Sequence, residues 1–171
     1  MSEGPRELIV PVGLPGSGKS TWSRELVDSA RPGKIARING DSLRAMLHNG
    51  RYDGERTEAQ TREVTQAAIR ACFLAGARKV IVDATNLKLS VLRDWHALAA
   101  EVGVKLVLCP EFCDVPFELC LTRNAKRAYL KRVPTTRMYE MRETLRNETL
   151  PAIDMMRCGL LPWEPAVEKK D

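Results

Sequence analysis

The stretch Gly13–Ser20, GLPGSGKS, fits the pattern G-x-x-x-x-G-K-[ST], and it decides the fold. In such a loop several backbone N–H groups must approach phosphate oxygens at once. Glycine permits this because it lacks a Cβ atom and adopts positive φ angles. An apolar run, Leu8–Val12, precedes the loop, and a helical pattern from Gly18 to about Ala30 follows it. The positive end of that helix would face a bound anion, so this strand, loop and helix predict a binding site for a nucleoside triphosphate.

The same motif predicts which side chains act on the nucleotide. Lys19 would reach the β- and γ-phosphates, and the hydroxyl of Ser20 would be a ligand for Mg²⁺. Asp83 ends an apolar run and is expected to hold Mg²⁺ directly or through water, although it would also suit a turn cap ahead of Thr85. The residues of the loop expected to bind the nucleotide are Gly13, Pro15, Gly16, Ser17, Gly18, Lys19, Ser20 and Thr21.

Strand and helix patterns alternate after the loop. Further strands are expected at Lys34–Ile38, Lys79–Asp83 and Val104–Cys109, with helices between them. Strands separated by helices indicate βαβ units. The predicted fold class is therefore α/β with a P-loop NTPase fold. It comprises a parallel sheet of four to five strands, helices on both faces and a basic helical lid.

Two details of this pattern need the structure. Thr57 and Gln60 form a capping-box pattern that predicts the start of a long helix. The apolar stripe of that helix is expected at Val64, Ala68, Ala71 and Ala75. Pro11 lies inside the first predicted strand although proline cannot donate to a strand ladder, and the sequence does not explain how it is accommodated.

Length and composition exclude several classes of protein. A chain of 171 residues with 44% hydrophobic and 29% charged residues describes one globular domain, residues 1–171, with a loose tail at 162–171. No stretch approaches the ~20 apolar residues that cross a bilayer, and the first residues lack a basic segment followed by a long apolar run, so we expect no signal peptide. Five cysteines without a C-x-x-C pair agree with a reducing compartment, so the expected location is the cytoplasm.

Two further groups of residues point to chemistry beyond nucleotide binding. Asn39–Arg44 follows the second predicted strand, where ligands bind in parallel sheets. There Asp41 could accept a proton from an attacking hydroxyl and Arg44 could grip an anion, or they could be a helix cap and a solvated side chain. Residues 123–137 hold six basic and no acidic side chains. Such a segment could close over a triphosphate, follow a nucleic-acid backbone or face solvent.

With these residues placed, the chain resembles the kinase domain of bacteriophage-type polynucleotide 5′-hydroxyl kinases from Gly13 to about Arg142. The motifs keep the order of that family. GLPGSGKSTW matches its phosphate loop, ING-D-SLR its acceptor segment, and RNAKR with the following Val133 and Pro134 its lid. TNL and DVP match two further segments. The chain departs from the family at Ala84, where an aspartate is expected directly before Thr-Asn.

The resemblance implies a role for each matched residue. Asp41 would be the general base, Arg44 would hold the phosphate 3′ to the acceptor nucleoside, and Val133 would pack against the acceptor base. Thr85 and Asn86 would belong to the same substrate site. Arg123 and Arg127 would bind the donor phosphates and, together with Lys19 and Asp41, form the catalytic set.

The expected activity is transfer of the γ-phosphate of ATP, with Mg²⁺, to the 5′-OH end of DNA or RNA in nucleic-acid repair. Expected partners are those ends and a separate ligase or phosphatase, without a membrane, and in the host cytoplasm for a phage-encoded protein. Two alternatives remain open at this point: a P-loop kinase of a metabolite or nucleoside hydroxyl, and a nucleotide-dependent nucleic-acid-binding module without kinase activity.

Overall fold

The computed structural model describes residues 4–51 and 53–163, and its centre is a parallel sheet of four strands. The strands are β1 (Glu7–Pro11), β2 (Ile35–Asn39), β3 (Lys79–Asp83) and β4 (Lys105–Cys109). They lie in the order β2-β3-β1-β4, and each neighbouring pair is parallel. The sheet confirms the predicted fold class.

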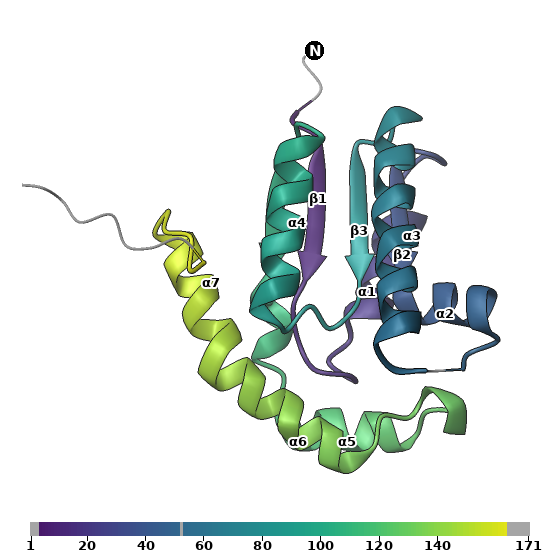
Figure 1. The fold of residues 1–171 in the computed structure, drawn as a ribbon, viewed down its shortest axis with the longest axis vertical. Helices are drawn as coiled ribbons and strands as arrows, with labels where there is room; N and C mark the ends of the chain where they lie inside the picture. The colour runs from purple at the N-terminus through teal and green to yellow at the C-terminus, as the bar shows by residue number, and fades with distance from the viewer. Residues whose placement is uncertain (1–3, 52, 164–171) are drawn as a thin grey trace, which may run out of the picture.

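Helices cover both faces of this sheet. The α-helices are α1 (Lys19–Asp28), α2 (Gly40–His48), α3 (Gly54–Leu74), α4 (Leu89–Glu101), α5 (Phe117–Ala125), α6 (Thr135–Thr144) and α7 (Leu150–Arg157). The step from β1 to β2 crosses the sheet in one direction, whereas the steps to β3 and β4 cross it in the other. Right-handed crossovers therefore place α1 on one face and α3 and α4 on the opposite face. Figure 1 shows α3 and α4 together in front of the strands.

The long helix α3 differs from the sequence prediction in its start and in its buried face. It begins at Gly54, and the Thr57 hydroxyl accepts the Asp53 N–H (3.1 Å) rather than capping with Gln60, so the capping-box prediction is wrong. The predicted stripe is right only in part, because Val64 and Ala68 are half-buried whereas Ala71 and Ala75 are exposed. The buried positions are Thr57, Thr61, Thr65, Ile69 and Phe73. Threonine is tolerated there because its hydroxyl bonds to the carbonyl four residues earlier.

Pro11 is accommodated by the local end of one strand ladder. The ladder between β1 and β3 covers Glu7–Ile9, and the Val12 N–H donates to the Cys109 carbonyl on the β4 side. Because successive residues of a strand bond to alternate sides, Pro11 faces β3 beyond the end of that ladder, where no N–H is needed. The Asn86 side-chain amide donates to the free Pro11 carbonyl at 2.8 Å.

The C-terminal helices cross the carboxyl edge of the sheet (Figure 1). Helices α6 and α7 are joined by a π-helical turn, Leu145–Thr149. The buried Thr149 hydroxyl donates to the Leu87 carbonyl at 2.6 Å and ties this turn to the loop after β3. The predicted loose tail falls, from residue 164 on, outside the described residues. Throughout residues 4–51 and 53–163, no helix combines the length and apolar character needed to cross a bilayer.

Candidate active site

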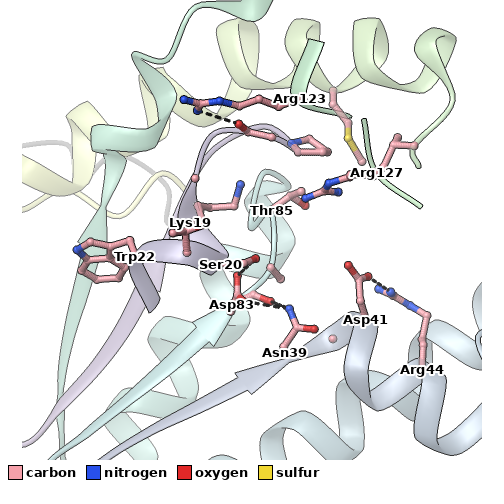
Figure 2. A pocket seen from close by; sticks show the side chains of 18 of the residues that line it. Lys19, Ser20, Trp22, Asn39, Asp41, Arg44, Asp83, Thr85, Arg123 and Arg127 are labelled. Atoms are coloured by element: carbon pink, nitrogen blue, oxygen red, sulfur yellow. Dashed lines mark hydrogen bonds and ion pairs between the residues drawn. The ribbon is translucent and has the colours of Figure 1, made fainter. Parts of the chain in front are cut away.

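A cavity of about 760 Å³ opens at the carboxyl edge of the sheet, where ligands bind in parallel α/β folds. Four segments contribute to its lining: the loop before α1, the start of α2, the end of β3 and the basic lid at the end of α5 and after it (Figure 2). The predicted site residues that line it are Pro15, Gly16, Gly18, Lys19, Ser20, Thr21, Asp41, Arg44, Asp83, Thr85, Arg123, Arg127 and Val133. Gly13, Ser17 and Asn86 are not among the lining residues.

The glycines of the loop meet two different requirements. A Cβ atom on Gly16 would lie 2.6 Å from the Cys120 carbonyl oxygen, and one on Gly13 would lie 2.7 Å from the Phe112 carbonyl oxygen. These two positions therefore let the loop pack against α5 and the short 3₁₀ helix Pro110–Cys113. Gly18 has a φ of 101° with nothing near its absent Cβ, and it caps the start of α1 with its backbone turned toward the cavity.

Lys19 is folded back into the loop. Its Nζ donates to the carbonyls of Gly13 and Leu14, each at 2.7 Å, and to the Ser17 hydroxyl at 3.0 Å. Burial in the loop disfavours the charged ammonium and lowers the pKa of Lys19 to about 8, and the nearby Asp83 carboxylate offsets part of this effect. The amine thus lies at the cavity wall, and its ammonium form loses a proton at a lower pH than an ordinary lysine does.

The Asp83 carboxylate joins the loop to strand β2. Its Oδ1 accepts the Ser20 hydroxyl at 2.9 Å, and its Oδ2 accepts Arg37 Nε at 2.7 Å and Asn39 Nδ2 at 3.1 Å. Two of these partners, Arg37 and Asn39, were not predicted from the sequence. Alternation along β2 puts them on one face, but only the pairing of β2 with β3 brings that face to Asp83.

The oxygens of Ser20 and Asp83 suit Mg²⁺. This ion prefers hard oxygen ligands, and in nucleotide sites it takes only one or two from the protein and the rest from phosphates and water. Among the described residues no group of three or more His, Cys, Asp or Glu side chains could hold a metal ion. Any cation here would therefore depend on the nucleotide for much of its coordination.

Asp41 and Arg44 face the loop from the α2 side of the cavity (Figure 2). The Asn39 side chain caps α2 by accepting the Ser42 N–H at 2.9 Å, so Asp41 is free of the capping role. Asp41 forms an ion pair with Arg44, whose Nε donates to Glu58 of α3 at 2.6 Å. Glu58 was not predicted from the sequence, and it lies fourteen residues from the arginine that it orients.

The lid has basic side chains at the cavity and a buried asparagine that holds its loop in place. Arg123 and Arg127 line the cavity, and Arg123 donates to the Gly16 carbonyl at 3.3 Å. Between them Asn124 is buried, and its side chain bonds both the N–H (3.1 Å) and the carbonyl (2.7 Å) of Val133. Asn124, which the sequence placed in the lid without a role of its own, thereby closes the basic loop and places Val133 at the cavity.

Thr85 and Asn86 have different positions. Thr85 lines the cavity, and its carbonyl accepts the Gly13 N–H at 3.1 Å. Asn86 is buried with a φ of 52°, and its side chain bonds the carbonyls of Pro11 and Val82 while accepting the indole N–H of Trp95. Its amide is thus engaged with the protein, and it supports the loop from behind.

Comparison with known proteins agrees with this geometry. The chain is 31% identical over 136 residues to the "Putative bifunctional polynucleotide kinase/RNA ligase" of Autographa californica nuclear polyhedrosis virus, covering 72% of this chain and 18% of the viral protein. It is 26% identical to a chain in the structure of the Pnkp1/Rnl/Hen1 RNA repair complex, with a TM-score of 0.68 over 85% of this chain and 45% of that one. These matches confirm the resemblance to polynucleotide kinases, although the chain spans less than half of either relative.

A second solved structure shows the fold alone. The Mycobacterium tuberculosis APS kinase CysC in complex with AMPPNP and APS is 22% identical, with a TM-score of 0.53 over 72% of this chain and 71% of that one. The family model described as AAA domain matches residues 8–147, which run from β1 through the loop, the cavity and the lid. Because that match extends over most of the chain, the protein belongs to the AAA domain family of P-loop proteins.

Proposed function

We propose that the protein is a polynucleotide 5′-kinase that transfers the γ-phosphate of ATP to the 5′-OH end of an RNA or DNA strand. One observation carries the proposal. A single cavity has a phosphate loop on one wall, the Asp41–Arg44 pair on the opposite wall and a basic lid above both. That arrangement supports a site with a donor end and an acceptor end. The relatedness to a polynucleotide kinase/RNA ligase and to a chain of an RNA repair complex favours a polynucleotide acceptor in RNA repair.

The chemistry assigned to the residues balances. Asp41 accepts the proton of the terminal 5′-OH, the oxygen attacks the γ-phosphorus, and the bond to the β-phosphate oxygen breaks to release ADP. Lys19, Arg123 and Arg127 stabilise the charge on the transferring group, while Arg44 holds a backbone phosphate of the acceptor. Mg²⁺ held with Ser20 and Asp83 would neutralise charge on the donor phosphates. Positioning and electrostatics supply most of the acceleration.

The 5′-phosphate product defines the proposed partner. A ligase needs such an end, and the viral relative carries both a kinase and an RNA ligase in its name. We therefore place the chain, as a single kinase domain, ahead of a strand-joining reaction.

Label transfer from γ-labelled ATP to 5′-OH RNA and DNA oligonucleotides tests the proposal. Wild-type protein should label at least one of them, and Asp41→Asn and Lys19→Ala should lower the rate by about 10²-fold or more. Arg70→Gln is the matched control, because Arg70 pairs with Glu101 on the outer surface of α3 and α4. Labelling of a panel of small alcohols but of no oligonucleotide would contradict the proposal. Nucleic-acid binding without any label transfer would also contradict it.

A further inference from the structure

Arg37 is a charged residue in the middle of β2 whose side chain contacts Asp83. It does not line the cavity, so it is not placed to touch a substrate. Its guanidinium is directed at one oxygen of Asp83, with Nε at 2.7 Å and Nη2 at 2.5 Å. The side chain of Asp83 is 2% exposed, so this carboxylate has little water to replace a lost partner.

The two oxygens of Asp83 have separate tasks because of this contact. Oδ2 accepts Arg37 Nε and Asn39 Nδ2 and is also ion-paired with Arg37 Nη2, whereas Oδ1 accepts the Ser20 hydroxyl at 2.9 Å. Arg37 reaches Oδ2 with two nitrogens of one rigid plane and Asn39 adds a third contact, so the position of Oδ2 is fixed from several directions; a lysine ammonium, a point charge on a flexible stem, would hold it less firmly. The contact therefore fixes the direction in which the remaining oxygen of Asp83 points.

We infer that Arg37 is a positioning residue that holds Asp83 with Oδ1 directed at Ser20. The Asp83 Oδ1 and the Ser20 hydroxyl oxygen are then preorganised for the cation of a metal–nucleotide complex. The inference rests on the nucleotide part of the proposed function and not on the identity of the acceptor. Groups behind a metal ligand that orient it typically change metal affinity by 10- to 100-fold when they are removed.

Charge and orientation make opposite predictions for the loss of Arg37. If the arginine acted only as a nearby positive charge, its removal would reduce repulsion and tighten Mg²⁺ binding. If it acts by orienting Asp83, its removal lets the carboxylate turn, and Mg²⁺ binding weakens. Arg37→Gln removes the charge and the planar pair of nitrogens that hold Oδ2, whereas Arg37→Lys keeps the charge and removes the planar pair. Both variants should weaken Mg²⁺ binding if orientation dominates.

The test measures nucleotide binding and does not require turnover. A fluorescent ADP analogue is titrated into each protein over a series of Mg²⁺ concentrations and in EDTA. We expect Arg37→Gln to raise the Mg²⁺ concentration at half-effect by about 10-fold or more, with affinity in EDTA within about 2-fold of wild type. For Arg37→Lys the Mg²⁺ concentration at half-effect should lie between those of the wild type and Arg37→Gln. The control is Arg70→Gln, which breaks a similar two-bond pair with Glu101 far from the cavity.

Each other result overturns the inference. Mg²⁺ binding that is equal or tighter in Arg37→Gln means that the arginine does not orient Asp83. If that variant does not fold, an Arg37→Lys protein with wild-type Mg²⁺ dependence gives the same refutation. The absence of any Mg²⁺ effect on the wild type also refutes it. Label transfer is scored separately: a wild type that binds metal–nucleotide but labels no oligonucleotide sinks the proposed kinase activity and leaves the role of Arg37 intact.

Discussion

Protonation of Lys19 should report directly on nucleotide binding. Burial lowers the pKa of Lys19 to about 8 in the nucleotide-free protein, against an ordinary value of 10.5. A polyphosphate beside the ammonium favours its charged form and should return the pKa to its ordinary range or above. Binding must therefore draw protons from solution. At about pH 8.5 the expected uptake is about 0.75 proton per nucleotide, and at about pH 7 it falls to about 0.1.

Unfolding of the nucleotide-free protein, like nucleotide binding, should take up protons at Lys19. The unfolded chain binds more protons than the folded one between about pH 8 and 10.5, so the free energy of unfolding gains from Lys19 as pH rises through that window. The two pKa values correspond to about 3 kcal/mol that ionised Lys19 costs the folded state below about pH 8. Bound nucleotide should remove most of this contribution because it keeps the ammonium charged.

Calorimetry in buffers of different ionisation enthalpy measures the uptake. The slope of the observed binding enthalpy against the buffer ionisation enthalpy gives the number of protons taken up per ADP. Lys19→Arg should abolish the uptake at about pH 8.5, since guanidinium stays charged at all accessible pH values. Lys34→Arg, at an exposed position outside the cavity, is the matched control and should keep it. A wild-type slope of zero at about pH 8.5, or proton release, would refute the reasoning.

Two further predictions concern the loop and the lid. Gly16→Ala should lower the free energy of unfolding, measured in urea, by more than Gly18→Ala does. Both glycines have positive φ, but only at Gly16 would a Cβ lie against a backbone carbonyl, 2.6 Å away. Equal losses would show that the approach of the loop to α5 is not tight. Asn124→Ala should leave the N–H and the carbonyl of Val133 without their side-chain partner. We expect this change to expose the basic loop to limited proteolysis and to raise the KM for the acceptor more than the KM for ATP. An unchanged digestion pattern would contradict the anchoring role.

Local signals in the sequence were enough for the elements that carry the phosphate loop. The run Leu8–Val12, the loop and the following helix are contiguous, so composition and spacing define them without knowledge of the rest of the chain. Strand Lys79–Asp83 was also predicted with its observed bounds, because a β-branched run between two helices has few other interpretations. What these elements touch was much less accessible from the sequence.

Helix α3 shows one reason. The prediction followed hydrophobicity and chose Ala71 and Ala75, yet the helix buries Thr61 and Thr65. A threonine hydroxyl that donates to the carbonyl four residues earlier no longer needs water, and its methyl group can then pack in the core. A hydropathy pattern counts that hydroxyl as polar and therefore displaces the predicted buried face, of which Val64 and Ala68 are half-buried and Ala71 and Ala75 exposed.

The cavity shows a second reason, which is distance along the chain. Arg37 and Asp83 are forty-six residues apart, and they meet because β2 pairs with β3 in the register that sets Asn39 opposite Asp83. The sequence predicted an acid at the end of a strand but not the arginine that holds it. Ala84 makes this partner more important, since the position directly before Thr85 offers no second carboxylate. If Arg37 has the proposed role, a site with one acid depends on the orientation of that acid, and we expect its affinity for Mg²⁺ to depend on β2 as much as on the loop that the motif identifies.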